Sequence, residues 1–268
     1  MKNTIKKAYA LLELERHIVG VKLAKSKEEL AGYDAVQVVS PISYCVAVKS
    51  ATLGHSVKFD RTTTGCGGST RALGLTEPTE GYYDGSEGCK LGLYSDSSVA
   101  AGVSKEMKIC SADTYGVIVK PIEAFEDKPD VVLIVTNSKN AMRIIQGYTY
   151  FYGMQNKFTM TGNQALCVEG TAVPIVTGEI NVSMFCSGTR FLAGWKDTEV
   201  AVGIPIDRFE KTIEGIRLTV NAVEPDERKT VIRKKLAPLG YKEDEIIMGD
   251  TYYLRLEREK RKNRRKDK

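Results

Sequence analysis

Apolar residues recur along this chain with two periods, one typical of strands and one typical of helices. Short β-branched runs predict strands at 19–23, 34–39, 56–59, 115–119 and 130–135. The run at 34–39 is apolar enough that we expect that strand to be buried. Helical spacing predicts helices over 3–16, 40–54, 99–108, 138–153, 207–222 and 224–236. Ser40 and Pro41 suit the start of the second of these helices, and Gly54 suits its end. The alternation of the two kinds of element indicates an α/β protein, although an α+β arrangement is possible.

The second half of the chain resembles the first. The segments Leu53–Phe59 and Tyr152–Phe158 share Gly, Lys and Phe at the same offsets, and Pro121–Phe125 is echoed by Pro205–Phe209. Such self-similarity predicts a duplicated unit. We therefore expect two similar halves with mixed sheets, packed helices and a cleft between them. The expected bounds are 1–240 for a single domain, about 15–125 and 126–225 for its halves, and 241–268 for a peripheral segment.

Two near-copies of one cysteine motif stand out from this framework. The first reads Cys66-Gly-Gly-Ser-Thr-Arg-Ala-Leu-Gly and the second Cys186-Ser-Gly-Thr-Arg-Phe-Leu-Ala-Gly. Each cysteine stands just before an expected helix, where backbone N–H groups stabilise a thiolate. Gly67, Gly68 and Gly188 allow close approach of a ligand to the main chain. Arg71 and Arg190 add positive charge. These five residues are therefore candidates for binding a cofactor or an anion.

Another cysteine lies about 20 residues before each motif. Cys45 falls in the helix expected over 40–54, and Cys167 falls in a further expected helix. Because ligands of α/β proteins bind at the carboxyl ends of strands, we expect both near one edge of the sheet. The four thiols then predict an iron–sulfur cluster in a redox role, or a zinc ion, held by Cys45, Cys66, Cys167 and Cys186. Cys89, in a glycine-rich loop, is a possible fifth ligand, whereas Cys110 suits a buried core position.

Two other interpretations stay open. Cys66 or Cys186 could be the nucleophile of a thiol enzyme that binds no metal, with Arg71 or Arg190 holding an anion. The glycine turns could instead bind a phosphate or a nucleotide. Motif searches do not decide the matter, since the chain has no GxGxxG after a strand, no Walker A loop and no GxSxG. For a metal centre or a thiol enzyme, we expect a redox partner or a small-molecule substrate.

Charge and cysteine usage limit the binding partners and the cellular compartment that we expect. The net charge of +5 comes from the tail at 255–268, which holds nine basic and three acidic residues. The tail is the one feature that suits nucleic acid, and a solvated helix end explains it as well. We expect no signal peptide and no membrane span, and thus a cytoplasmic protein. In that compartment thiols stay reduced, which favours metal ligands, redox chemistry or core packing over disulfides.

The motifs in their order resemble the uncharacterised ArCR family, also called domain of unknown function 169. The resemblance rests on Cys45 with Ala51 and Gly54, on Cys66-Gly-Gly and Leu73-Gly-Leu75, on Pro129–Val132, on the Cys167 segment, on Cys186-x-Gly-x-Arg190 and on Ile204-Pro205. The resemblance covers roughly residues 15–225. The family that the chain resembles is mostly prokaryotic. The resemblance implies a cysteine-bearing α/β protein and supports Cys45, Cys66, Cys167 and Cys186 as matched positions. It implies no particular reaction, and the basic tail lies outside the family pattern.

Overall fold

The computed structural model describes residues 1–220, 224, 226–242, 259–260 and 263–264. These residues form two compact units. One contains residues 1–14, 142–154 and the chain from 210 onward, and the other contains residues 15–141 and 155–209. The units differ from the two halves expected from the sequence, so the duplication stays a prediction. Most of the basic tail lies outside the described residues.

The larger unit is built on one seven-stranded sheet with the order β2-β3-β4-β1-β5-β7-β6. Its strands are β1 (Val19–Ala24), β2 (Val36–Gln37), β3 (Val57–Asp60), β4 (Gly116–Pro121), β5 (Val131–Asn137), β6 (Asn181–Ser183) and β7 (Glu199–Pro205). Only β2 and β3 pair in parallel, and the other neighbours are antiparallel. The sheet is therefore mixed, and the α/β fold class predicted from the sequence is confirmed. Pairing of β1 with β5 joins the strands of both predicted halves into this one sheet.

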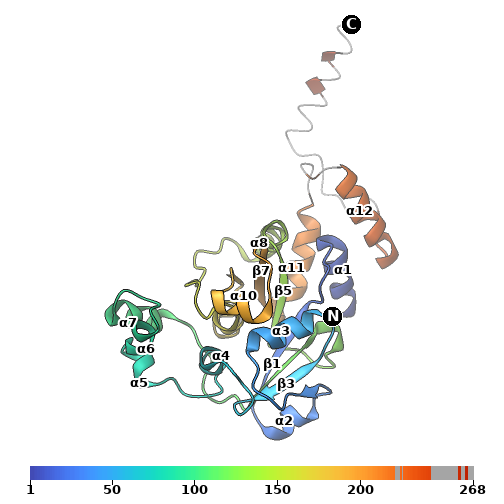
Figure 1. Cartoon of the computed structure of the whole chain (residues 1–268). Coiled ribbons are helices and arrows are strands. Elements are labelled where there is room, and N and C mark those ends of the chain that lie inside the picture. Colours follow the sequence, from blue (N-terminus) through green and yellow to red (C-terminus); the bar gives the residue numbers. More distant parts are fainter. Residues whose placement is uncertain (221–223, 225, 243–258, 261–262, 265–268) are drawn as a thin grey trace. The chain divides into compact units, whose positions relative to one another are not determined.

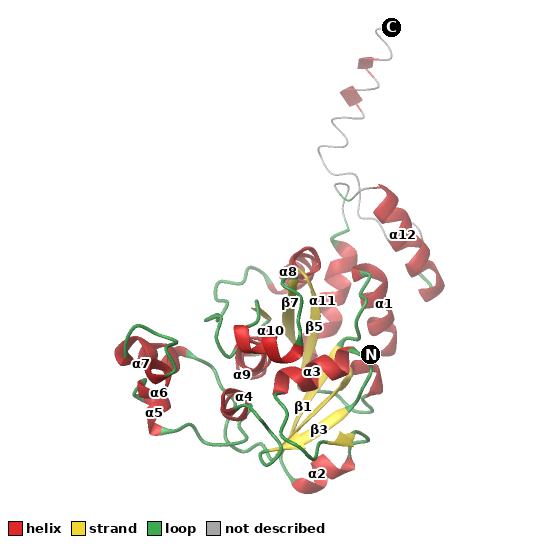
Figure 2. Ribbon diagram, in the orientation of Figure 1, coloured by secondary structure: helices red, strands yellow, loops and turns green. Residues whose placement is uncertain are grey.

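Helices pack against both faces of the sheet in the larger unit (Figures 1 and 2): the main core lies on one face, and Leu30 packs with Ala24 and Ile118 on the other. The helices of the larger unit are α2 (Lys27–Gly32), α3 (Tyr44–Thr52), α4 (Gly67–Ala72), α5 (Glu80–Tyr83), α6 (Ser86–Lys90), α7 (Ser97–Glu106), η1 (Ile122–Ala124), η2 (Ala165–Ala172), α9 (Val173–Thr177) and α10 (Ser187–Ala193). Alternate residues Val19, Val21 and Leu23 of β1 belong to a core shared with α3, η2 and Trp195. This period of two places the three residues on one face of the strand, as expected for a strand that packs under helices.

The smaller unit is helical. It contains α1 (Lys2–Leu12), most of α8 (Ser138–Tyr152), most of α11 (Ile206–Leu218), α12 (Asp226–Leu236) and η3 (Ala237–Leu239). The backbones of α8 and α11 approach closely where Gly147 meets Gly215, because a Cβ built on Gly215 would lie 2.0 Å from the Gly147 carbonyl oxygen. Across the described residues, we find no helix with the length and apolar composition needed to cross a membrane.

The segment before α3 departs from the sequence prediction. A buried strand at 34–39 was wrong, since β2 has only two residues and Val36 and Val39 are 70% and 87% exposed. As an edge strand, β2 pairs only with β3. A helix start at Ser40 and Pro41 was also wrong. The chain is not helical before Tyr44, and the Ile42 backbone N–H donates to the Thr63 carbonyl instead. The helix begins one residue after Ser43, whose hydroxyl accepts from the Val46 N–H.

Candidate functional site

Cys186 is the N-cap residue of α10, as its motif predicted. Its backbone is extended, and its sulfur accepts a hydrogen bond from the Thr189 backbone N–H at 3.3 Å. The Thr189 hydroxyl also contacts this sulfur at 3.1 Å. Partial burial opposes ionisation of Cys186, but hydrogen bonds from the Thr189 hydroxyl and from the backbones of Ala165, Thr189 and Gly188 outweigh it and lower the pKa of the thiol. Cys186 is thus a thiol prepared to ionise, half-buried in the structure.

Cys45 contacts the same threonine from another helix. It lies in the first turn of α3, which runs beside α10 (Figure 1). Its sulfur is 3.1 Å from the Thr189 Oγ1, so one hydroxyl bridges the two thiols. Cys45 is only 7% exposed, and burial raises the pKa of its thiol to about 12. The bridge therefore joins a thiol whose pKa is lowered to one whose pKa is raised.

Cys167 lies within η2, a π-helix of eight residues that are all buried. Runs of this helix type are rare and occur often at functional sites. Burial raises the pKa of Cys167 well above its usual value. The carboxylate of Glu169, two residues on and 1% exposed, accepts from the backbone N–H groups of Thr161 and Gly162 and fixes the preceding loop. The sequence predicted a helix here, but the apolar pattern gives no sign that it is a π-helix and not an α-helix.

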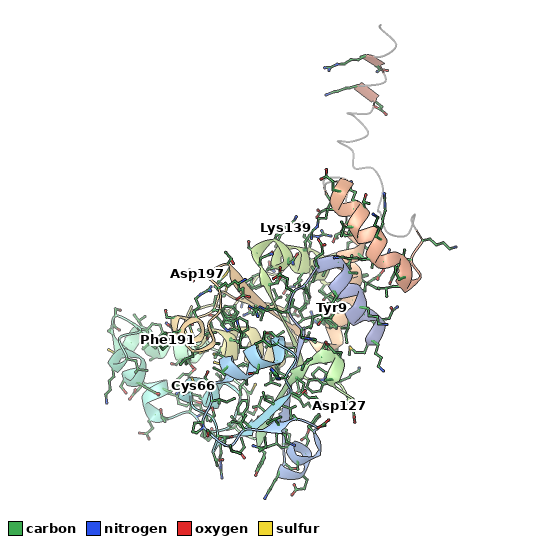
Figure 3. The ribbon with its side chains drawn as sticks, turned by 45° about the vertical axis from the view of Figure 1, so that its right-hand side comes forward. Tyr9, Cys66, Asp127, Lys139, Phe191 and Asp197 are labelled. Atoms are coloured by element: carbon green, nitrogen blue, oxygen red, sulfur yellow. The ribbon has the colours of Figure 1, made fainter. Side chains whose placement is uncertain are left out.

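Cys66, labelled in Figure 3, is the N-cap residue of α4. Both motif cysteines therefore hold the helix-start position that the sequence predicted. The Cys66 side chain makes no capping hydrogen bond. A Cβ on Gly68 would lie 3.2 Å from the Cγ of Gln164, the residue that precedes η2, whereas a Cβ on Gly67 would meet nothing within 4 Å. Gly68 thus allows the motif of α4 to pack against the start of the helix that carries Cys167.

The four predicted cysteines converge. Besides burial, charge on Cys186 and Cys66 raises the pKa of Cys45, and charge on Cys45, Cys66 and Cys186 raises that of Cys167. Among the described residues, however, no group of three or more Cys, His, Asp or Glu side chains has the geometry of a metal site. The sulfurs as placed do not fit a metal ion or cluster, so the iron–sulfur or zinc centre stays a prediction.

Backbone strain is concentrated at this cluster. Three described residues other than glycine have positive φ, and two of them, Gln164 (49°) and Phe185 (65°), belong to the larger unit. Phe185 directly precedes Cys186 and stacks on Trp195, with ring centroids 5.2 Å apart. The side-chain oxygen of Gln164 is buried without a hydrogen-bond partner. Strained residues of this kind persist where the surrounding structure imposes them, and they gather at functional sites.

The two motif arginines make internal contacts. The Arg190 guanidinium donates to the carbonyls of Lys196, Met184 and Glu199 at 2.5, 2.8 and 3.2 Å. Arg71 donates to Glu87 and lies 4.1 Å from the centroid of the Tyr82 ring. These contacts tie α10 to the following loop and α4 to the α5–α7 segment. The predicted roles of both arginines, and of Gly67, Gly68 and Gly188, in binding a cofactor stay predictions.

Sequence reasoning missed Thr189, although its signal was present. Both motifs carry a Thr-Arg pair, but the first has one extra residue between cysteine and threonine. An N-cap side chain bonds to the residue three positions on. Thr189 occupies that position after Cys186, whereas Thr70 lies four after Cys66 and its hydroxyl donates to the Cys66 carbonyl instead. Because of this one-residue difference, the threonine hydroxyl contacts the cysteine sulfur in the second motif but not in the first.

The remaining two cysteines and one cavity of the larger unit involve other elements. Cys89 is half-buried on α6, and Cys110 is 8% exposed in the core, as predicted for it. The cavity has a volume of about 570 Å³ and contains none of the six cysteines in its lining. It is lined by Tyr82, Tyr83, Ala101, Gly102, Ser104, Lys105, Met107, Lys108, Ile109 and Val176.

Comparison with known proteins agrees with the resemblance seen in the sequence. The chain is 26% identical over 219 residues to an uncharacterised protein of Methanocaldococcus jannaschii, and the match spans 81% of this chain and 93% of that protein. No solved structure matches the chain. The sequence model of the family described as uncharacterised ArCR, DUF169, matches residues 8–215. Since this match covers most of the chain and all four clustered cysteines, the protein belongs to the ArCR (DUF169) family.

Proposed function

We propose that the four-cysteine cluster is a reactive-thiol site in which Cys186 is the nucleophile. The observation that carries this proposal is the set of hydrogen bonds that converge on the Cys186 sulfur, from the Thr189 backbone and hydroxyl. A thiolate needs such donors, because the charged form is the one that attacks. Cys186 is half-buried, unlike Cys45 and Cys167, which are buried, so it is the more exposed of these three cysteines.

The other buried cysteines suit this role less well. Burial raises the pKa of Cys45 and of Cys110 to about 12, and raises that of Cys167 well above its usual range. At neutral pH these thiols stay protonated and react slowly. The contrast with Cys186, whose pKa is lowered, favours one nucleophile among several inert thiols.

The strained backbone supports the same assignment. Phe185 adopts a positive φ of 65° immediately before Cys186, and its stacking on Trp195 maintains that conformation. Such strain costs on the order of 1–3 kcal/mol, so it is expected where it serves to position a group. Here it directs the chain so that the next residue caps α10 with its sulfur.

The reaction class that follows is nucleophilic attack by sulfur on an electrophilic atom of a small-molecule substrate. The Cys186 thiolate forms a new bond to that atom, and the electron pair of the broken bond leaves with the departing group. The Thr189 hydroxyl donates to the thiolate before the attack. That this protein acts on a small-molecule substrate, or works with a redox partner, is part of the same proposal.

Rates of alkylation test the proposal. Reduced full-length protein is treated with limiting iodoacetamide between pH 5 and 9, and modified peptides are quantified by mass spectrometry. Cys186 should react fastest, with a midpoint below the ordinary cysteine pKa of about 8.5. Cys89, half-buried on α6, and Cys110, buried in the core, are internal controls. A Cys186 that reacts no faster than Cys89 contradicts the proposal.

A thiolate-bound metal is the second candidate, because, besides burial, Cys66 and Cys186 both lie close enough to raise the pKa of Cys45 and of Cys167. It requires the sulfurs to move into a ligand geometry that they do not have as placed. Anaerobic purification followed by iron, zinc and sulfide analysis distinguishes the candidates. Stoichiometric metal that is lost in Cys45→Ser and Cys167→Ser, but retained in Cys110→Ser, would favour the metal. Protein without stoichiometric metal whose Cys186 alkylates fast would favour the nucleophile.

A further inference from the structure

Cys45 and Cys186 are close enough to react with each other. Each sulfur lies 3.1 Å from the Thr189 Oγ1, so the two sulfurs are at most about 6 Å apart. They belong to the neighbouring helices α3 and α10, and each side chain can rotate about its own Cα–Cβ bond. Disulfide formation needs a sulfur–sulfur distance of about 2.05 Å, so both side chains must turn toward each other and the threonine hydroxyl must move aside once it has passed its proton.

The surroundings of the two thiols differ in the way that a redox couple needs. Cys186 is half-buried and accepts hydrogen bonds from the Thr189 N–H and hydroxyl. Cys45 is only 7% exposed, so its sulfur is shielded from a substrate in solution. In dithiol sites the accessible, easily ionised thiol attacks and the buried one reacts second.

We propose that Cys45 and Cys186 form a reversible dithiol–disulfide couple that reduces disulfides of small thiols. The inference rests on the proposed role of Cys186 as nucleophile and names the class of substrate.

The steps balance as follows. The Cys186 thiolate attacks one sulfur of the substrate disulfide, whose S–S bond breaks, and the first small thiolate leaves and takes a proton from water. Cys45 then loses its proton to the Thr189 hydroxyl, which passes a proton toward the departing group, and attacks the Cys186 sulfur. The mixed disulfide breaks and the second small thiol leaves. Two protein thiols are oxidised to one disulfide, and one substrate disulfide is reduced to two thiols.

The position of Thr189 fits this sequence. Its hydroxyl contacts both sulfurs and can accept from one while donating to the other. Only 1% of Thr189 is exposed, so bulk water does not compete with the two thiols for its hydroxyl. The bridge gives a proton path between a thiol that must lose a proton and a group that must gain one.

Oxidised glutathione is the probe for the test. Reduced full-length protein is incubated with it without oxygen, free thiols are counted, and disulfide-linked peptides are identified by mass spectrometry. Two thiols should be lost, and one peptide pair should join Cys45 to Cys186. Cys45→Ser should stop at a mixed disulfide of glutathione on Cys186. Cys110→Ser is the matched control, because it removes another buried cysteine, and it should behave as the unaltered protein does.

The outcomes separate this inference from the proposed function. Fast alkylation of Cys186, together with a stable glutathione adduct in the unaltered protein, would overturn the couple and leave the nucleophile intact. A disulfide from Cys186 to Cys66 or Cys167 would overturn it equally. Slow alkylation of Cys186 and no reaction with glutathione would overturn both. Circular dichroism of Cys45→Ser checks its fold, and if it is unfolded, Cys45→Ala gives the same comparison.

Discussion

The sulfur of Cys45 lies 3.1 Å from the hydroxyl oxygen of Thr189, although 144 positions separate the two residues in the chain. The same oxygen contacts Cys186 three residues before it. A single hydroxyl therefore connects the cysteine of the predicted first half with the cysteine motif of the predicted second half. This contact exists because α3 and α10 lie side by side on the same core.

Removing that hydroxyl should slow the reaction of Cys186. Thr189→Val keeps the shape and the backbone N–H but loses the donor to the thiolate, so the pKa of Cys186 should rise. A hydrogen bond to a charged group contributes about 1.5 kcal/mol, which corresponds to about tenfold slower alkylation at neutral pH. The pH profile of alkylation measures the shift. Thr189→Ser restores a hydroxyl and should keep the rate within about twofold; equal loss in both variants would show that packing, not hydrogen bonding, is responsible.

Cys45 should make the protein less stable in alkali. Burial raises the pKa of Cys45 to about 12 in the folded state, against an ordinary value of about 8.5 when unfolded. The contribution of the protonated Cys45 thiol to the free energy of unfolding is fully present below the unfolded-state pKa. It is lost as the pH rises toward 12, because the thiol of the unfolded chain ionises first. The limiting slope is about 1.4 kcal/mol per pH unit.

Urea unfolding at a series of pH values from 8 to 11 measures this effect. Cys45→Ala should flatten the dependence relative to the unaltered protein, whatever its cost in packing. Cys89→Ala, at a half-buried position on α6, is the matched control and should retain the slope. An unchanged slope in Cys45→Ala would mean that Cys45 ionises normally in the folded protein.

Local elements of the fold could be predicted from the sequence, while the contacts between them could not. The strand at Val19–Ala24 and the helix from Ser138 are encoded by short-range apolar patterns and agree with the prediction within a residue or two. The exposure of Val36 depends instead on β2 lying at the sheet edge, which is set by strand order and not by the residues of β2. The apolar character of 34–39 was therefore misleading.

The candidate site shows the same division. Cys66 and Cys186 were predicted at helix starts because glycines and a small-residue stretch follow each of them, and both are N-cap residues. The bridge through Thr189 could not be predicted, since it requires α3 to pack beside α10. The left-handed backbone of Gln164 and Phe185 also has no sequence signal, because tertiary contacts impose a conformation that these residue types disfavour.

Arg190 should contribute to stability more than to anion binding. Its guanidinium donates to three backbone carbonyls, a fork that lysine cannot reproduce. Arg190→Lys should lower the free energy of unfolding by about 1–3 kcal/mol. Arg61→Lys, at an exposed position, is the control and should change stability by less than about 0.5 kcal/mol. If phosphate raises the melting temperature of the unaltered protein but not of Arg190→Lys, Arg190 is an anion ligand after all.

The close approach of α8 and α11 should not tolerate a methyl group. A Cβ on Gly147 would lie 2.5 Å from the Thr212 carbonyl oxygen and 2.6 Å from the Ile216 nitrogen, both backbone atoms that cannot turn away. Gly147→Ala must therefore push the helices apart, and we expect the free energy of unfolding to fall by about 2–3 kcal/mol. Gly102→Ala in α7 is the matched control, because a Cβ there meets nothing within 4 Å. Alanine has the higher helix propensity, so this variant should gain about 0.5–1 kcal/mol. Urea unfolding compares the two, and a gain in both variants would mean that α8 and α11 do not approach each other in this way in solution.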